Sequence, residues 1–321
     1  MIEYRSIADL NKTILDNLSK VPRDIDLVVG IPRSGLLAAS MLALHLNLPL
    51  TDLDGFVEGR VISGGRRSRG HRVDLRATSN LRVFVLDDSI QSGEQMAEVK
   101  ARIDRANLPH EIIFGVVYGS PQGCESVDIC FEVLATRRLF EWNLMHHSIL
   151  DRSCVDIDGV LCSDPTREQN DDGPAYADFL VNADPLLIPS VPIGWLVSCR
   201  LEKYRELTRR WLVKHGVTYR ELIMMDLPSK EARVTAGSHG KFKADVYAKT
   251  GAHLFIESSD RQAREIAALT GKPVFCVEAQ TMVYPSRLRR ARKRMRWLAQ
   301  WLWRKARSLR RSVHLRLRAL R

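Results

Sequence analysis

The chain has 321 residues, enough for two domains of ordinary size, and its 45% hydrophobic content is typical of a globular protein. No stretch reaches the roughly 18 consecutive apolar residues of a membrane-spanning helix, and we expect no secretory signal at the start of the chain. The formal net charge is +11, but residues 287–321 hold 15 of the 49 Lys and Arg residues and no acid. Residues 1–286 therefore carry 34 bases against 38 acids, a net charge of −4, which removes the main argument for nucleic-acid binding by the body of the chain.

The cysteines point to a reducing compartment. The six residues contain no Cys-x-x-Cys pair and no histidine companion at the spacing of a zinc site. We therefore expect six reduced thiols in a cytoplasmic protein.

The first part of the chain alternates β-branched runs with helical stretches, which predicts a parallel α/β sheet. The predicted strands are residues 26–30, 81–86, 111–118 and 127–133, and the helices between them are residues 36–46 and 94–106. A second series begins at residue 153, with strands at 153–161, 193–198, 221–225 and 253–258 and helices at 201–215 and 241–250. The fold class expected is α/β, with two doubly wound parallel-sheet domains at residues 1–148 and 149–286 and a helical tail at residues 287–321.

Residues 27–39, LVVGIPRSGLLAA, predict a strand, a tight turn and a helix. The start of the helix offers free backbone N–H groups and the positive end of a dipole, and Arg33 adds further donors. Together with Ser34 and Gly35 these groups suit a phosphate, although a strand, a turn with glycine and a helix are also common in purely structural roles.

Residues 83–95, VFVLDDSIQSGEQ, place Asp87 and Asp88 directly after a buried strand. Open α/β sheets bind ligands at this end of their strands. Adjacent carboxylates are paired acceptors for vicinal ribose hydroxyls, and the turn at Ser92 and Gly93 can wrap a 5-phosphate with backbone amides. Between the two loops, residues 59–72 are rich in Gly and Arg; they suit either a lid that neutralises pyrophosphate through Arg66 and Arg67 or a plain surface loop.

Taken in order, these segments resemble a type I phosphoribosyltransferase over roughly residues 20–140. The resemblance implies a pyrophosphate loop at 30–35, a flexible loop at 59–76 and a loop for phosphoribosyl pyrophosphate (PRPP) at 83–95. It also implies PRPP-binding residues, which are Arg33, Ser34, Gly35, Asp87, Asp88, Ser92 and Gly93. The family usually has Thr or Ser where this chain has Gln91 and Gln95, and Glu94 adds a negative charge beside the expected phosphate.

The second series carries polar residues at several strand ends. Asp156 and Asp158 follow a strand in SCVDIDGVLC, Ser198 ends the next strand, and Glu257 ends the strand HLFIES. Phosphomonoester hydrolysis needs such groups: a carboxylate nucleophile, a second carboxylate as acid and base, and a hydroxyl and an ammonium on the phosphoryl oxygens. An inert α/β domain with coincident polar residues is the alternative.

Residues 150–278 resemble the haloacid dehalogenase (HAD) superfamily. The resemblance implies Asp156 as nucleophile, Asp158 as acid and base, and Ser198 and Lys243 as phosphate ligands. It further implies Mg²⁺ held by Asp156, Asp158 and Glu257. Lys230 and Lys241 compete with Lys243 for the role of the lysine, and Asp260 competes with Glu257 for the late acid.

In the tail, apolar residues recur every three or four positions from Leu288 to Leu320, and the remaining positions are mostly Arg. Trp297, Trp301 and Trp303 would act as interfacial anchors. We expect an amphipathic helix on an anionic membrane surface, at the inner face of the membrane. A partner protein and nucleic acid are the alternatives.

The two resemblances together predict a bifunctional enzyme. A transferase would move 5-phosphoribosyl from PRPP to an acceptor with release of pyrophosphate, and a phosphatase would then remove the 5-phosphate. This combination resembles the bacterial route to ribofuranose in surface polysaccharides, with a glycan as acceptor. The alternatives are a nucleobase-salvage transferase with a nucleotide-directed phosphatase, and a non-catalytic regulator that senses PRPP.

Overall fold

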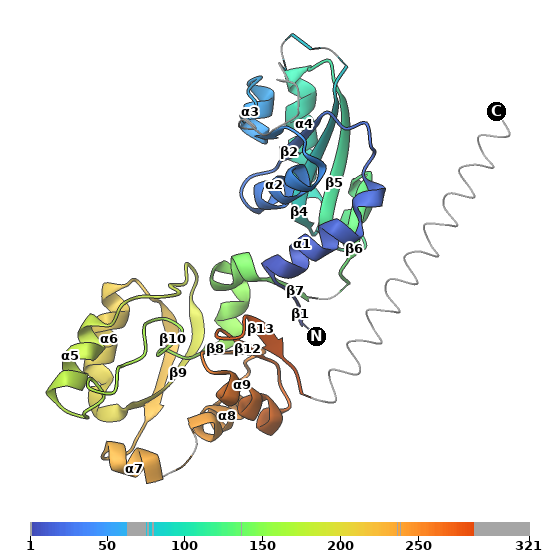
Figure 1. Ribbon diagram of the computed structural model, residues 1–321. Helices are drawn as coiled ribbons and strands as arrows, with labels where there is room; N and C mark the ends of the chain where they lie inside the picture. Colours follow the sequence, from blue (N-terminus) through green and yellow to red (C-terminus); the bar gives the residue numbers. More distant parts are fainter. Residues whose placement is uncertain are drawn as a thin grey trace. The chain divides into compact units, whose positions relative to one another are not determined.

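The computed structural model describes residues 2–62, 75, 77–78, 80–135, 137–235, 237 and 239–285 (Figure 1). Its chain divides between Arg138 and Leu139 into two compact units. The predicted lid residues Arg66 and Arg67 and the predicted tail helix lie outside the described residues. Within the described residues, no helix is both long and apolar enough to cross a membrane.

The first unit is built on a five-stranded parallel sheet with the strand order β3-β2-β4-β5-β6 (Figure 1). The strands are β2 (Leu27–Gly30), β3 (Leu50–Asp52), β4 (Arg82–Ile90), β5 (Glu111–Gly119) and β6 (Ile129–Val133). In the register of β2 and β4, Gly30 lies beside Leu86. The carboxyl ends of these two strands therefore meet at one edge of the sheet, where ligands of such sheets bind.

In the described part of this unit the sheet is covered by helices α1 (Ile7–Asp16), α2 (Ser34–Leu46), α3 (Leu53–Val57) and α4 (Glu94–Ala106). Alternate residues of a strand point to opposite faces, and Val29 and Val85 share one face with Phe56 of α3 and Val99 of α4 in a single buried cluster. α2 contacts α1 and runs beside β2 and β4. A short two-stranded sheet pairs β1 (Ile2–Arg5) with β7 (Arg137–Phe140).

The second unit has a six-stranded sheet in the order β10-β9-β8-β11-β12-β13. Its strands are β8 (Ser153–Val155), β9 (Ile193–Leu201), β10 (Tyr219–Met225), β11 (Leu254–Glu257), β12 (Val274–Cys276) and β13 (Thr281–Val283). All neighbours are parallel except β12 and β13. The helices are α5 (Pro174–Asn182), α6 (Arg205–Lys214), α7 (Lys230–Thr235), α8 (His239–Lys249) and α9 (Asp260–Thr270), with short 3₁₀ turns at Glu141–His146, Ser148–Arg152 and Glu202–Tyr204.

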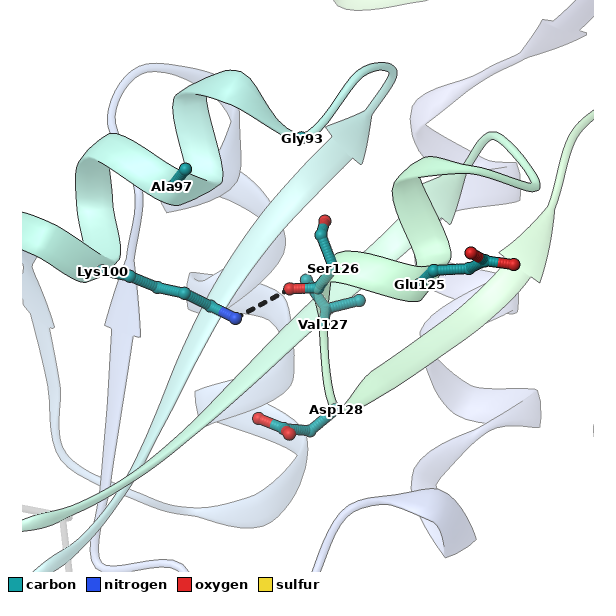
Figure 2. Close-up of a pocket in the computed structure, with 7 residues that line it drawn as sticks. All are labelled: Gly93, Ala97, Lys100, Glu125, Ser126, Val127 and Asp128. Atoms are coloured by element: carbon teal, nitrogen blue, oxygen red, sulfur yellow. Dashed lines mark hydrogen bonds between the residues drawn. The ribbon is translucent and has the colours of Figure 1, made fainter. Parts of the chain in front are cut away.

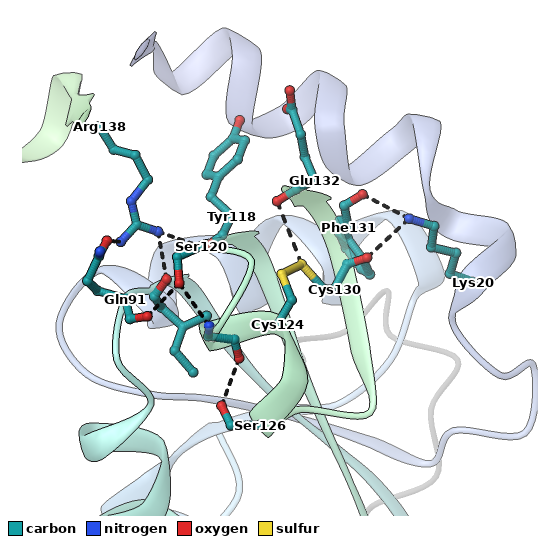
Figure 3. The surroundings of a disulfide bond; sticks show 12 residues. Lys20, Gln91, Tyr118, Ser120, Cys124, Ser126, Cys130, Phe131, Glu132 and Arg138 are labelled. Carbon is teal, nitrogen blue, oxygen red and sulfur yellow. Dashed lines mark hydrogen bonds between the residues drawn. A yellow bond between two sulfur atoms is a disulfide. The ribbon is translucent and has the colours of Figure 1, made fainter. Parts of the chain in front are cut away.

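The prediction of an α/β fold with parallel sheets is confirmed, but two details of it are wrong. β4 and β9 continue past their predicted ends, so that Asp87 and Asp88 lie inside β4 rather than after it, and Ser198 lies inside β9 rather than at its end. The expectation of six reduced thiols also fails, because Cys124 and Cys130 form a disulfide (Figure 3). The 3₁₀ turn η2 (Gly123–Ser126) brings Cys124 back beside β6, where the two Cα atoms are 5.5 Å apart.

Candidate functional site

The first candidate site lies at the edge of the sheet where β2 leads into α2 and β4 leads toward α4. Ser34 opens α2, and its Oγ donates a hydrogen bond of 2.7 Å to Asp88 Oδ1. A side chain at Gly35 would place its Cβ 2.6 Å from Asp87 Oδ1, so glycine is required for α2 to begin this close to the acidic pair. Arg33 precedes them as an exposed residue, joined to Pro32 by a cis peptide bond. The predicted pyrophosphate loop and the acidic pair are therefore in direct contact.

Asp87 and Asp88 are both buried, with exposed fractions of 7% and 4%. The backbone N–H of Asp88 donates to Asp87 Oδ1 at 2.9 Å. Burial raises the pKa of Asp87 to about 8, and the neighbouring charge of Asp88 adds to the rise. Near neutral pH the Asp87 carboxyl group therefore still holds its proton. Donors such as a pair of sugar hydroxyls would stabilise the fully ionised pair.

The turn after β4 enters α4 through Gly93, whose φ of 95° lies in the left-handed region that favours glycine. No described side chain caps this helix start, and the Glu94 N–H only approaches Ser92 Oγ at 3.4 Å. Such a helix N-terminus suits an anion. A cavity of about 260 Å³ lies beside Gly93 and is lined also by Lys100, whose Nζ donates to the Ser126 carbonyl at 2.8 Å (Figure 2).

Sequence reasoning missed Arg138, which holds the start of this turn. Its guanidinium donates to the Ile90 carbonyl at 2.7 Å, to the Tyr118 carbonyl at 3.4 Å and to the side-chain oxygen of Gln91 (Figure 3). Gln91, one of the departures from the family pattern, is therefore engaged by an arginine. A lone arginine 47 residues away gives no signal of this contact in the sequence.

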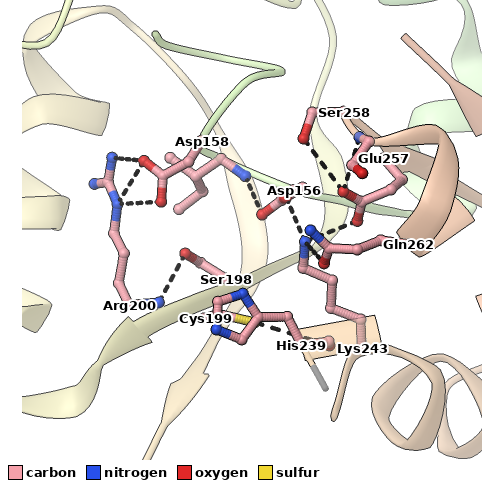
Figure 4. Close-up of polar contacts among 12 residues, drawn as sticks. Asp156, Asp158, Ser198, Cys199, Arg200, His239, Lys243, Glu257, Ser258 and Gln262 are labelled. Carbon is pink, nitrogen blue, oxygen red and sulfur yellow. Dashed lines mark hydrogen bonds and ion pairs between the residues drawn. The ribbon is translucent and has the colours of Figure 1, made fainter. Parts of the chain in front are cut away.

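The second candidate site is a buried charge cluster at the carboxyl ends of β8 and β11 (Figure 4). Lys243 reaches from α8, and its Nζ donates to Asp156 Oδ2 at 2.6 Å, to Glu257 Oε2 at 2.8 Å and to Gln262 Oε1 at 3.1 Å. All three charged groups are at least 96% buried. One ammonium thus binds two carboxylates, and the cluster satisfies the rule that buried charges are paired.

The electrostatics of this cluster follow from its burial. Burial raises the pKa of Asp156 to about 7, Lys243 opposes the rise, and the charge of Glu257 adds to it. Burial acts to lower the pKa of Lys243, but the two carboxylates outweigh it and raise the pKa. Lys243 is therefore charged near neutral pH.

Asp158, the predicted acid and base, is paired with an arginine of the neighbouring strand. Arg200 of β9, which is fully buried, donates from Nη2 to Asp158 Oδ1 at 2.6 Å and from Nε to both carboxylate oxygens at 3.1 Å. Such a forked contact fixes the orientation of a carboxylate. Sequence reasoning missed Arg200 as well, although it lies two residues after Ser198.

The three predicted Mg²⁺ ligands are not grouped as a metal site. Lys243 stands between Asp156 and Glu257, and Asp158 faces Arg200. In the described part of the chain no group of three or more His, Cys, Asp and Glu side chains is arranged to hold a metal ion. Mg²⁺ binding by this side-chain set therefore stays a prediction from the sequence.

The remaining predicted residues are separated by the structure. Ser198 is fully buried, and its Oγ accepts a hydrogen bond from the Arg200 N–H at 3.2 Å. Lys241 is exposed, and Lys230 donates to the Asn170 carbonyl. Asp260 opens α9 and pairs with Arg264 at 2.7 Å. Among the competing residues, the structure thus places Lys243 and Glu257 beside Asp156.

A cavity of about 230 Å³ opens onto the second site. Asp156, Asp158 and Lys243 line it, together with Cys199 and Arg233. Since this volume is below the 300–1,000 Å³ of typical ligand pockets, the cavity suits a small polar group such as a phosphate rather than a whole large ligand.

Residues 2–149, slightly less than half of the chain, match the family model described as the phosphoribosyl transferase domain. The first part of the chain is therefore a phosphoribosyltransferase-type domain, in agreement with the resemblance carried by its loops. No curated protein matches the chain.

Several solved structures are similar to this chain. A purine phosphoribosyltransferase from Pyrococcus horikoshii Ot3 is 20% identical, with 44% of this chain and 93% of that chain covered and a TM-score of 0.34. The Helicobacter pylori xanthine-guanine-hypoxanthine phosphoribosyltransferase is 12% identical, with coverages of 45% and 93% and a TM-score of 0.34. An orotate phosphoribosyltransferase from Aeropyrum pernix is 19% identical, with coverages of 39% and 70% and a TM-score of 0.28.

Proposed function

We propose that the chain is a bifunctional enzyme whose phosphoribosyltransferase-type domain transfers 5-phosphoribosyl from PRPP to an acceptor and whose second, HAD-like domain removes the 5-phosphate from the product. The observation that carries the proposal is the buried Asp87–Asp88 pair in contact with the start of α2. Two adjacent buried carboxylates cost stability, and a ligand that presents paired hydroxyl donors accounts for them.

In the first reaction, Asp87 and Asp88 would accept hydrogen bonds from the two ribose hydroxyls of PRPP. The backbone N–H groups in the first turn of α4, after Gly93, suit the 5-phosphate, and those in the first turn of α2 suit the pyrophosphate. The acceptor attacks the anomeric carbon, the bond from that carbon to pyrophosphate breaks, and pyrophosphate leaves with the bonding electrons.

In the second reaction, Asp156 would attack the phosphorus of the 5-phosphate. The bond between phosphorus and the sugar oxygen breaks, and Asp158, oriented by Arg200, supplies the proton that this oxygen takes. Water then attacks the phosphorylated Asp156, gives its proton to Asp158 and releases inorganic phosphate. Lys243 would neutralise charge beside Asp156 in both steps.

A phosphatase joined to a phosphoribosyltransferase makes chemical sense where plain ribofuranose is wanted on the acceptor, because nucleotide salvage needs to keep the phosphate. We therefore favour a surface-polysaccharide glycan as acceptor, with the basic tail at the inner face of the membrane. A nucleobase acceptor and a PRPP-sensing regulator are the alternatives.

The test incubates the full chain with PRPP, Mg²⁺ and either glycan acceptors or free nucleobases, and weighs the products by mass spectrometry. Wild type should give a ribosyl adduct of the glycan, Asp156→Asn a phosphoribosyl adduct, and Asp87→Asn neither. Formation of nucleotides with nucleobases, together with no adduct with any glycan, would refute the proposal that a surface-polysaccharide glycan is the acceptor. PRPP binding without turnover in both assays would favour the regulator.

A further inference from the structure

One buried cation that lines the cavity of the second unit forms no ion pair with a carboxylate of the described residues. Arg233 of α7 is only 8% exposed and lines the same cavity as Asp156 and Lys243. Its Nη1 donates to the Cys199 carbonyl at 3.2 Å. Its Nε is buried and has no hydrogen-bond partner among the described residues.

The other two buried cations of this region are neutralised by carboxylates. Lys243 lies 2.6 Å from Asp156 and 2.8 Å from Glu257, and Arg200 lies 2.6 Å from Asp158. Within the described part of the chain, no carboxylate forms an ion pair with Arg233. An arginine cannot shed its charge in a protein, and a buried charge without a partner is costly. An unsatisfied group of this kind calls for an explanation, and a bound anion supplies one.

We propose that Arg233 binds the non-bridging oxygens of the phosphate that Asp156 attacks. This rests on the proposed phosphatase function of the second unit. The planar guanidinium presents a fork of donors that matches two phosphate oxygens, which a lysine cannot do. The guanidinium is held by the Cys199 carbonyl and by a side-chain hydrogen bond with Tyr176, and its Nε, which has no partner among the described residues, is left for the ligand.

Arg233 takes the role of phosphate ligand that the resemblance to the HAD superfamily implied for Ser198. The Ser198 hydroxyl is fully buried and accepts from the Arg200 N–H, whereas Cys199, the next residue, lines the cavity. Arg233 is bonded to that next residue and reaches the cavity from another element. Without Arg233, the three aspartates of the lining would face a phosphate dianion with Lys243 as the single opposing cation in the described lining.

The experiment measures binding of inorganic phosphate to the full chain by calorimetry, alongside hydrolysis of ribose 5-phosphate. Arg233→Gln should weaken phosphate binding at least tenfold, as expected for the loss of hydrogen bonds to a charged group. Arg233→Lys, which keeps the charge without the fork, should give an intermediate loss. Arg209→Gln, which removes an arginine that is 56% exposed, is the matched control and should bind phosphate as wild type does.

The two proposals fail in different ways. Unchanged phosphate affinity in Arg233→Gln and Arg233→Lys overturns the role of Arg233. Slower hydrolysis of ribose 5-phosphate without weaker binding of inorganic phosphate overturns it as well. Absence of phosphate binding in wild type also overturns it. Arg233-dependent phosphate binding without any hydrolysis supports the anion site and refutes the phosphatase. Circular dichroism during heating shows whether each variant is folded.

Discussion

Asp87→Asn should make the first domain more stable at high pH while abolishing its transfer activity. The substitution keeps the shape of the side chain and removes one of two adjacent buried charges. The new amide can donate to Asp88, as the protonated Asp87 carboxyl group can near neutral pH, and its oxygen can still accept a hydrogen bond from the Asp88 N–H. The expected gain is therefore electrostatic and depends on pH.

The sign follows from the direction of the pKa shift. The pKa of Asp87 rises from 3.8 to about 8 in the folded state. A raised pKa means that the proton stabilises the fold, so this contribution is fully present below the ordinary pKa and is lost as pH rises through about 8. At 1.36 kcal/mol per pH unit, the wild-type domain would lose on the order of 5 kcal/mol across this window.

Hydrogen exchange followed by mass spectrometry measures the effect locally, on the amides of β4 and β5. Comparing the variant with wild type at one pH removes the intrinsic pH dependence of exchange. Near pH 9 the variant should be at least tenfold better protected, and near pH 4 the two should agree. Asp104→Asn, an exposed position on α4, is the control and should change little at either pH. Equal protection of Asp87→Asn and wild type near pH 9, or the same difference at both pH values, would refute the reasoning.

Three further predictions concern other parts of the chain. Gly35→Ala should lower the free energy of unfolding by about 1–3 kcal/mol and weaken PRPP binding, because the new Cβ would lie 2.6 Å from Asp87 Oδ1. Calorimetry measures both effects. Gly251→Ala is the neutral control, because no atom lies within 4 Å of the position that its Cβ would take. Lys243→Met should destabilise the second unit by about 3–5 kcal/mol in urea, because two buried carboxylates lose their cation, and the exposed Lys241→Met should not; similar urea midpoints would contradict this. Alkylation of the unfolded, unreduced chain should label four of its six cysteines, and labelling of all six would contradict the disulfide.

The central strands and the acidic pair could be predicted because they depend on local pattern. The apolar run before Asp87 predicts a buried parallel strand, and the structure has β4 at this place. The continuation of β4 to Ile90 could not be predicted, since aspartate and serine disfavour strands. The strand continues because its backbone pairs with β5 as far as Ile90, which lies beside Gly119, and this pairing outweighs the unfavourable strand propensity of the residues.

Other residues of the sites depend on contacts between distant segments. Arg138 and Arg200 reach partners 48 and 42 residues away, and no spacing rule connects them. α1 was missed although its signal was present: Ser6 and Asp9 form a capping box, with each side chain accepting from the backbone N–H of the other. The disulfide could not be predicted, because two cysteines six residues apart match no known disulfide or metal-binding motif.

Arg138 also sets a practical limit on how the chain can be divided. The chain passes from the first unit to the second directly after Arg138, yet the guanidinium of this residue donates to the Ile90 carbonyl and to the Gln91 side chain at the turn that leads to Gly93. A separately expressed first domain that stopped before this residue would keep every strand of the five-stranded sheet but lose the hydrogen bonds that hold the start of the predicted PRPP loop. Fragments of the first domain should therefore end beyond Arg138. We expect a shorter fragment to bind PRPP more weakly than the intact domain does.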